Sequence, residues 1–430
     1  EEGRKHSQRH TLTFICLVVA ALIGIGAGVV LLLFMRKRDE PIFFIWLPCL
    51  AFLVAGCLAF INFLPTLWMY YVTSDSPGAF FGGIMNSTAS QFLPIVGVVA
   101  LMAVAGNIML RKKDPDAMPI DRVWTTSFWQ TKHTFTAVIV GICFGFCALA
   151  YLSLFYLAGR AVGVWCPLET PDLNSLATAM PWASALAAGT CAALGEELFF
   201  RYFAVLALLW LTGRRWLAVV VPAAVWAFLH STYPQEPVFI RGIELTISGT
   251  VFGLVLLRYG VVSTITAHYI INAMICTDFL IRNGTASVVV PSLIVAILPV
   301  FLLIPGLWRR LRGRAWATAE EVRLVPVPKT AQAVVSRIMD HDEKHASLPH
   351  AAVGAIPVRR VAVLVFMAVV ALATYLWLPR GETFGDYVHP SINRMQAAER
   401  ADAYMRSRGV NVDDYKRTVW LSMRKNVGAA

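Results

Sequence analysis

Two adjacent glutamates, Glu196 and Glu197, lie in a segment that is otherwise largely apolar from 181 to 211. A charge at bilayer depth costs from about 2.5 kcal/mol upward, so such a group is usually paired, faces the protein interior and serves a function. Arg201 follows Glu197 by four residues, so on a helix the two share a face and can neutralise each other. Glu196 lies about 100° from Glu197 around the helix axis and therefore lacks Arg201 as a partner. The pattern fits either a purely structural ion-pair network or an ion pair beside a carboxylate that can do acid–base chemistry.

Two histidines and one asparagine favour the second interpretation. Of the nine histidines, only His230 and His268 fall inside strongly apolar segments, each on a different predicted helix downstream of the glutamates. Asn272 follows His268 by four residues and therefore shares its helical face. Together with Glu196 these residues supply a carboxylate, two imidazoles and an amide at membrane depth. That set of groups is a plausible catalytic constellation.

At these positions the sequence resembles the CPBP family of intramembrane proteases, which includes the CAAX prenyl endopeptidases and the Abi-type bacteriocin-processing and immunity proteins. The family motifs EExxxR, FxxxH and HxxxN correspond to Glu196–Arg201, Trp226–His230 and His268–Asn272, with Trp226 in place of the phenylalanine. The resemblance covers 181 to 282, about a quarter of the chain. Each motif alone is weak, but their order, spacing and membrane setting agree. We expect Trp226 to keep a packing role.

The resemblance implies an intramembrane endopeptidase in which Glu196 activates a water molecule. A carboxylate removed from water accepts a proton more readily, which suits Glu196 to be the base. The residues that the resemblance implies for the rest of the site are His230, His268 and Asn272, supported by Glu197 and Arg201. The histidines can orient the water, bind a metal or donate to the oxyanion, and Asn272 is a natural oxyanion donor.

The use of a metal is open at this point. His230, His268 and Glu196 resemble a three-ligand zinc set, and the same residues also suit a metal-free glutamate protease. A second histidine pair, His341 and His345, lies in a polar stretch that we expect to be an exposed linker and not a metal site. The eight cysteines show no CxxC or zinc-ligand spacing, so neither a disulfide framework nor a thiolate metal site is indicated.

Composition places the chain among polytopic membrane proteins. Hydrophobic residues make up 57% of the sequence and charged residues 15%, which is typical of an all-α bundle of transmembrane helices. Counting apolar runs predicts about eight to ten spans and a small soluble C-terminal tail. The net charge of +11 is spread over loops and tails, so nucleic-acid binding is not expected. The expected partners are membrane lipid and a peptide or protein substrate, lipidated substrates included, at the bacterial cytoplasmic membrane.

Charge and polarity divide the chain into five regions. The predicted regions are N-terminal transmembrane helices over 1–180, a catalytic membrane core over 181–308, a basic polar loop over 309–360, a last transmembrane helix over 361–378 and a soluble tail over 379–430. We expect the first apolar run, from 12 to 35, to be a retained helix and not a signal peptide, because its length and the basic cluster after it fit a membrane span.

Several local features accompany these regions. A Gly- and Ser-containing loop is predicted over 74–91, before a span that starts at residue 92. Prolines predict kinks in the span over 288–308. A capping box at Thr318 and Glu321 predicts a short helix, and an amphipathic helix is expected over 391–407, ended by Gly409.

The distribution of Lys and Arg over alternate loops predicts the orientation. The basic loops, among them those at 111–132 and 214–215, fall on one side, which the positive-inside rule makes cytoplasmic. The N-terminus and the tail after 379 then lie outside, as do the opposite loops, which carry few basic residues (Arg160, Arg241 and Arg282). Arg4, Lys5 and Arg9 argue against that placement of the N-terminus.

Two other function classes compete with the endopeptidase. One is a non-catalytic bacteriocin-immunity or scaffold protein that keeps the motifs for structure. The other is an ion- or proton-coupled transporter, in which Glu196 and the two histidines relay protons. The sequence shows no inverted repeat and no paired broken helices, which argues against a transporter.

Overall fold

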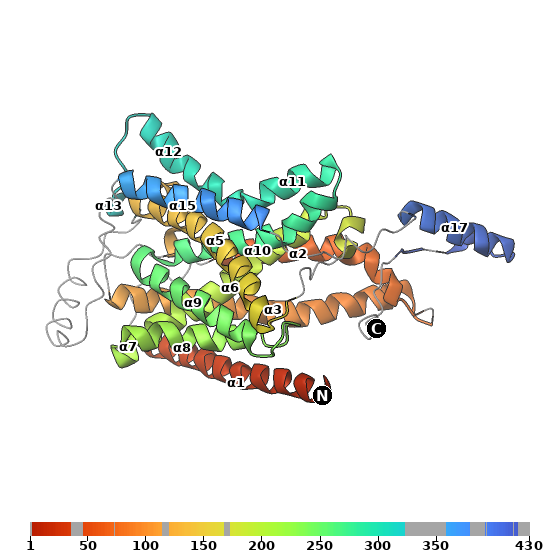
Figure 1. Cartoon of the computed structure of the whole chain (residues 1–430), viewed down its shortest axis with the longest axis horizontal. Coiled ribbons are helices and arrows are strands. Elements are labelled where there is room, and N and C mark those ends of the chain that lie inside the picture. The colour runs from red at the N-terminus through yellow and green to blue at the C-terminus, as the bar shows by residue number, and fades with distance from the viewer. Residues whose placement is uncertain are drawn as a thin grey trace.

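The computed structural model shows an all-α protein (Figure 1). It describes residues 2–35, 46–72, 74–113, 120–166, 173–322, 358–378, 392, 394–415 and 417–419. Its main elements are α1 (Glu2–Met35), α2 (Trp46–Phe63), η2 (Leu64–Tyr70), α3 (Pro77–Lys113), α5 (Lys132–Gly159), α6 (Trp182–Glu196), η6 (Glu197–Val205), α7 (Leu206–Thr212), α8 (Arg215–Phe228), α9 (Ile240–Tyr259), α10 (Val261–Asn283), α11 (Ala286–Ala296), η7 (Leu298–Leu303), α12 (Ile304–Leu311), α13 (Ala319–Val322), α15 (Val358–Trp377), α17 (Arg394–Ser407) and η8 (Val412–Asp414).

The number of membrane spans agrees with the predicted class. Within the described residues, seven helices are long and apolar enough to cross a membrane, or eight if the bent pair from Ala286 to Leu311 is one span. The apolar segment around the two glutamates is divided into α6, η6 and α7. Helix α8, which leads to His230, has only 14 residues, which at 1.5 Å per residue falls short of the roughly 30 Å hydrocarbon core. Two of the three motifs therefore lie on or next to short or irregular helices, whereas His268–Asn272 lies on the regular helix α10.

The predicted loop over 74–91 is wrong, because α3 already begins at Pro77. Apolar residues within that stretch give the helix something to pack against: Phe81 lies edge-on to Trp68 at a centroid distance of 4.7 Å. Aromatic packing of this kind outweighs the weak helix preference of Gly and Ser.

Other local predictions are confirmed. The span containing prolines bends by 49° between α11 and η7. Thr318 and Glu321 exchange the hydrogen bonds of a capping box in front of α13. The amphipathic helix of the tail is α17, after which Gly409 adopts a φ of +78°. His341 and His345 lie outside the described residues, as do most of the basic loop and the start of the tail.

Close approach of helices holds α10 in the middle of the bundle. On α5, Gly141 and Gly145 face α10, where an added Cβ at Gly145 would come within 2.8 Å of the Ile270 side chain. Small residues spaced four apart allow helix backbones to approach in this way. On its other side α10 packs against α6, where an added Cβ at Gly189 would meet Tyr269 at 2.9 Å. The helix that carries His268 is therefore fixed against the helix that ends at Glu196.

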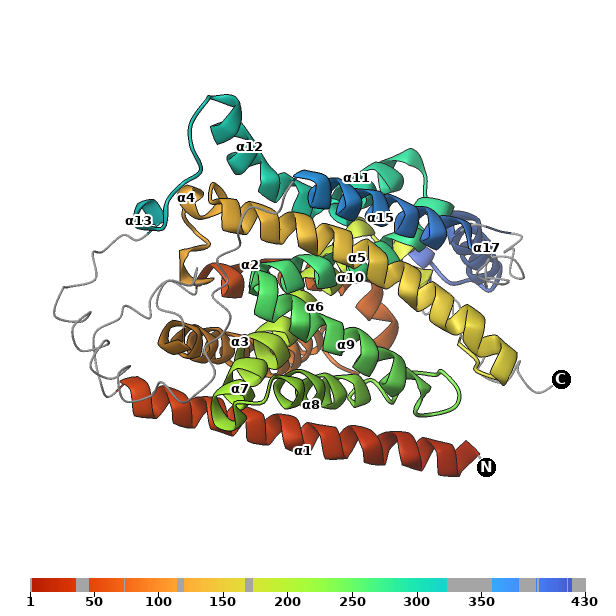
Figure 2. The same cartoon turned by 60° about the vertical axis from the view of Figure 1, so that its left-hand side comes forward.

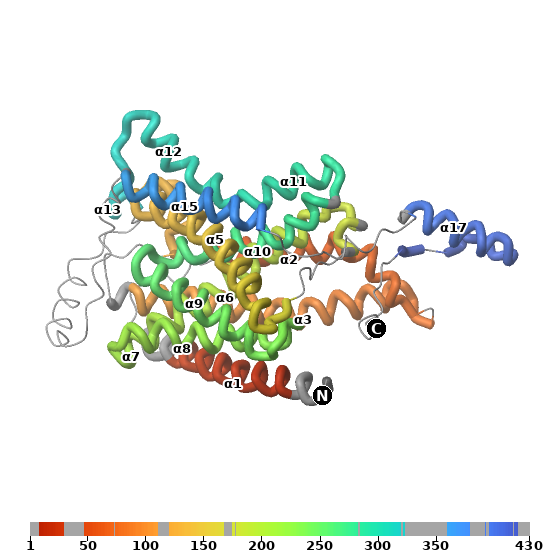
Figure 3. The backbone as a smooth tube through the Cα atoms, viewed as in Figure 1, coloured from red at the N-terminus to blue at the C-terminus, as the bar shows by residue number. Residues whose placement is uncertain are grey.

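The remaining helices surround this centre. Helices α8 and α9 pack against each other as an antiparallel pair, and α15 lies along α5 (Figure 3). Figure 2 shows α1 running along α8, with its N-terminal end near the loop that joins α8 to α9. The arrangement brings the first helix of the chain to the end of the helix that leads to His230.

Candidate active site

The two glutamates lie where the chain changes from α-helix to π-helix. Helix α6 ends at Glu196, and the π-helical segment η6 begins at Glu197. Wider turns of this kind occur often at functional sites. The Glu197 side chain is fully buried, whereas that of Glu196 is 30% exposed. The prediction that the two carboxylates differ in surroundings is confirmed.

Glu197 belongs to a buried ion-pair network. Its Oε1 lies 3.3 Å from Nη1 of Arg201 and 2.7 Å from Nδ1 of His268. The Arg201 guanidinium also stacks on the Trp226 ring, with Cζ 3.9 Å from the centroid. Glycine at position 249 makes room for this arginine, because an added Cβ there would lie 3.0 Å from Nη2 of Arg201. The network fixes the His268 ring and neutralises the inner carboxylate.

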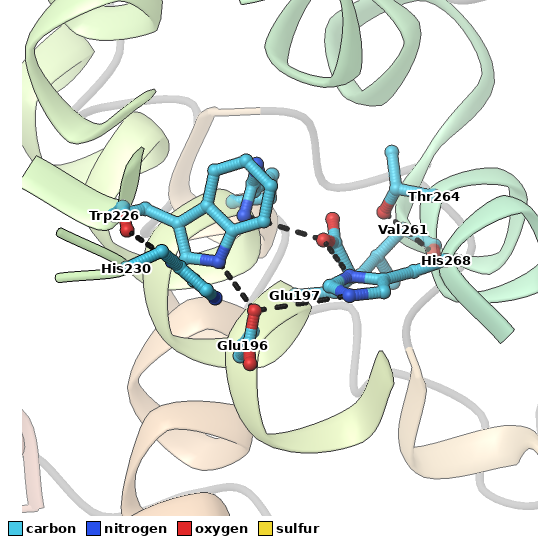
Figure 4. A network of polar contacts seen from close by, with 8 residues as sticks. Glu196, Glu197, Trp226, His230, Val261, Thr264 and His268 are labelled. Carbon is cyan, nitrogen blue, oxygen red and sulfur yellow. Dashed lines mark hydrogen bonds and ion pairs between the residues drawn. The ribbon is translucent and has the colours of Figure 1, made fainter. Parts of the chain in front are cut away.

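Glu196 is held by two groups from other helices (Figure 4). The indole Nε1 of Trp226 donates a hydrogen bond to Oε2 of Glu196. Nε2 of His268 lies 3.7 Å from the same oxygen, close enough for one water molecule to contact both atoms. Glu196 is therefore oriented by α8 and α10 and remains partly open.

The role of Trp226 extends beyond the packing that the sequence predicted. Phenylalanine, which the family motif has at this position, cannot donate such a hydrogen bond. A buried indole N–H usually finds a partner, so a tryptophan in an apolar helix near an unpaired carboxylate was the signal for this contact.

His230 lies just beyond the last residue of α8. Its Nδ1 is 2.9 Å from the carbonyl oxygen of Trp226, and its ring is 5.3 Å from the Trp226 ring, nearly edge-on. Because the carbonyl can only accept, Nδ1 donates and Nε2 is left as the acceptor of the neutral ring. Figure 4 shows the rings of His230 and His268 beside Glu196. The three predicted residues are thus brought together from α6, the end of α8 and α10.

Asn272 lies one turn after His268 on α10, as predicted. Its Nδ2 donates to the carbonyl oxygen of Ala188 on α6 at 3.4 Å, and it is half-buried. This contact places the amide on the α6 side of the site, two turns before Glu196. Its role as an oxyanion donor stays a prediction.

Two further acids that lie near membrane spans are separate from the site. Glu244 is buried and forms an ion pair with Arg241 at 2.5 Å. Asp278 pairs with Arg282 at 3.1 Å near the end of α10. Both are accounted for as structural ion pairs.

Whether a metal ion fits depends on how close together the candidate ligand side chains lie. Both histidines donate a hydrogen bond through Nδ1, which leaves Nε2 as the acceptor. Histidine ligands of metal ions have this arrangement, and so do histidines that accept a hydrogen bond from water. Among the described residues, no three His, Cys, Asp or Glu side chains lie close enough together to hold a metal ion. The side chains by themselves are sufficient for general-base chemistry, and zinc binding stays a prediction.

Exchanging Trp226 for phenylalanine tests its hydrogen bond. We expect kcat of a Trp226→Phe variant to fall by about tenfold, because the Glu196 carboxylate loses the donor that fixes its position, a bond to a charged group worth about 1.5–3 kcal/mol. The ring remains to stack on Arg201, so thermal stability should stay close to that of the wild type. Steady-state cleavage rates and a melting curve measure both quantities. An unchanged kcat would show that the indole N–H does not serve the reaction.

Comparison with known proteins agrees with this part of the chain. Residues 178–274 match the family model described as type II CAAX prenyl endopeptidase Rce1-like. A stretch of 149 residues is 23% identical to the sporulation-killing factor biosynthesis protein SkfC of Bacillus subtilis (strain 168) and covers 34% of this chain. That match spans only 30% of the length of SkfC. No solved structure matches the chain. The family match contains Glu196, His230 and His268.

Proposed function

From the Rce1-like domain at residues 178–274 we propose that this multi-pass membrane protein is an intramembrane endopeptidase. The observation that carries the proposal is the Glu196 carboxylate, 30% exposed, with Nε2 of His268 3.7 Å away and both groups oriented by separate buried contacts. A base on a rigid, partly open site is what hydrolysis at membrane depth requires.

The reaction begins with a water molecule beside Glu196 and His268. Glu196 takes a proton as the water oxygen attacks the peptide carbonyl carbon, and it then passes that proton to the departing amine. His268 accepts a hydrogen bond from the water through Nε2, while Glu197 holds its Nδ1 and thereby the ring. These contacts support a general-base mechanism in which Glu197 and Arg201 position the reacting groups and do not themselves react.

The negative charge on the carbonyl oxygen needs a donor in the transition state. Asn272 is the amide donor that the sequence predicts, and His230 donates through Nε2 only when its ring is protonated, because Nδ1 already serves the Trp226 carbonyl. In its neutral form His230 is an acceptor, and because the two hydrogens of the attacking water go to Glu196 and His268, it accepts from a second water molecule. The proposal therefore gives the oxyanion to Asn272, the attacking water to Glu196 and His268, and a neighbouring water to His230.

Cleavage by the purified protein in detergent tests the function. The assay compares prenylated and unprenylated peptides, because the matching family is that of CAAX prenyl endopeptidases and we propose a peptide substrate of that class for this chain. Release of the C-terminal fragment should depend on Glu196. A wild-type protein that cleaves none of these peptides would favour a non-catalytic scaffold.

Treatment with a metal chelator distinguishes a zinc-dependent enzyme from a metal-free glutamate protease. The metal-free interpretation predicts that a strong chelator leaves turnover unchanged and that elemental analysis of active protein finds no stoichiometric transition metal. If zinc is a cofactor, the chelator should abolish activity, added metal should restore it, and a His230→Ala variant should lose its bound metal. Metal content and activity are measured on the same sample, so the two results can be matched.

A further inference from the structure

A single arginine of the N-terminal helix binds the turn that follows His230. Nη2 of Arg9 donates to the carbonyl oxygen of Gln235 at 2.9 Å and to Oε1 of Glu236 at 2.7 Å. Nη1 donates to the carbonyl oxygen of Ser231 at 3.3 Å and to that of Tyr233. One guanidinium on α1 thus contacts four acceptors more than 220 residues away in the sequence.

These acceptors lie in the turn that begins where helix α8 ends at Phe228. The last carbonyl groups of α8 are bonded by the amides of the next three residues, whereas the carbonyls of the turn itself need a donor from elsewhere. His230 lies in the same tight turn, since its own carbonyl oxygen accepts from the Tyr233 amide at 3.1 Å. A guanidinium that fixes the carbonyls of Ser231 and Tyr233 therefore also fixes the backbone on either side of the histidine.

The far end of the same turn is held from another direction. Backbone groups of Trp165 and Glu236 exchange two hydrogen bonds of 2.8 Å, and the Gln235 side chain donates to Sγ of Cys166 at 3.6 Å. With Arg9 on one side and the chain after α5 on the other, the turn has two anchors. Of the two, only Arg9 reaches the first residues after His230.

The side chain of Arg9 is suited to this contact and not simply exposed to water. It is 12% exposed although it lies near the start of the first membrane span. Its contact with Glu236 also explains why a basic residue occurs on the side of the membrane where the loop distribution predicted few. Helix α1 lies outside the matched segment of 178–274, so the family match assigns this residue nothing.

We propose that Arg9 is a positioning residue for His230, and that α1 completes the active site by fixing the turn at 231–236. This inference rests on the proposed endopeptidase function for its effect on catalysis, while the contact itself can be tested without it. Arginine is needed because its planar fork reaches several acceptors at once, whereas lysine offers a single charge.

Hydrogen exchange of the full-length protein in nanodiscs tests the contact directly. In an Arg9→Ala variant we expect the amides of residues 230–236 to exchange at least about tenfold faster than in the wild type, with α10 unchanged. Arg9→Lys should lie between the two, and Arg214→Ala, which removes an exposed arginine at the opposite end of α8, should match the wild type. Wild-type exchange rates in Arg9→Ala would overturn the proposal, whether or not the protein is a protease.

Kinetics on the same samples test the link to His230. We expect Arg9→Ala to lower kcat about tenfold with KM within about twofold, because a displaced catalytic group affects the chemical step more than binding. Arg9→Lys should restore part of kcat, and a melting curve should show that the variants remain folded. If Arg9→Ala proves unstable, Glu236→Ala removes one side-chain contact alone and should give a smaller change of the same kind. Faster exchange with unchanged kcat in a cleaving enzyme would reject the positioning role.

Discussion

Replacing Glu196 by glutamine should lower the cleavage rate by about 10²–10⁴-fold, the range typical for removal of a general base. Glutamine keeps the size of the side chain and can still accept the hydrogen bond from Trp226. It cannot take a proton from water, so the chemical step should fail while substrate binding and the fold persist. The rate is measured in detergent with the substrate peptide above its KM, and folding by a melting curve.

The matched control is Glu399→Gln, which removes an exposed carboxylate on α17 outside the membrane core. It should cleave at the wild-type rate. A Glu196→Gln protein that cleaves at a similar rate to this control would rule out Glu196 as the base. The family match would then have to be reconciled with a different catalytic group or with a non-catalytic role.

Replacing Arg201 by alanine should cost about 3–5 kcal/mol of stability, the typical loss when one partner of a buried ion pair is removed. The Arg201 and Glu197 side chains are 1% and 0% exposed, so the carboxylate would keep its charge without its main partner. The change also removes the guanidinium from the face of Trp226. We therefore expect a large fall in the free energy of unfolding and in the yield of folded protein.

Two variants separate these contributions. Arg201→Lys keeps a charge near Glu197 but loses the planar stacking on Trp226, so its loss should be smaller than that of alanine. Arg406→Ala removes an exposed arginine from α17 and should leave stability unchanged. Normal stability of Arg201→Ala would mean that the ion pair does not hold the two helical turns together. Any activity that survives in Arg201→Ala would agree with a supporting role for this residue.

Much of the candidate site was predictable from local spacing. Glu197 and Arg201 are four residues apart, and any helical turn brings such a pair onto one face, so their ion pair follows from the sequence. The same holds for His268 and Asn272 on α10 and for the kink in the proline-containing span. Composition alone also determined the membrane class, because so apolar a chain cannot expose its surface to water.

The irregular elements were not predictable in this way. Periodicity of 3.6 residues cannot distinguish α-helix from the π-helical turns of η6, nor does it show that α8 has only 14 residues. Gly and Ser in the stretch over 74–91 predict a loop, whereas aromatic packing against η2 makes most of it the start of α3. At the start of α3 the deciding interaction therefore comes from another segment of the chain.

What the sequence by itself determined is therefore the list of reactive groups and the pairs that share one helix. Which group meets which was decided by the tertiary structure: Trp226 donates to Glu196 across 30 residues, His268 meets Glu197 across 71, and Arg9 reaches the turn after His230 across more than 220. The physical reason is that these contacts depend on how closely α5, α6, α8 and α10 pack. Side chains and glycines spread over the whole chain set that packing, and no local pattern records it.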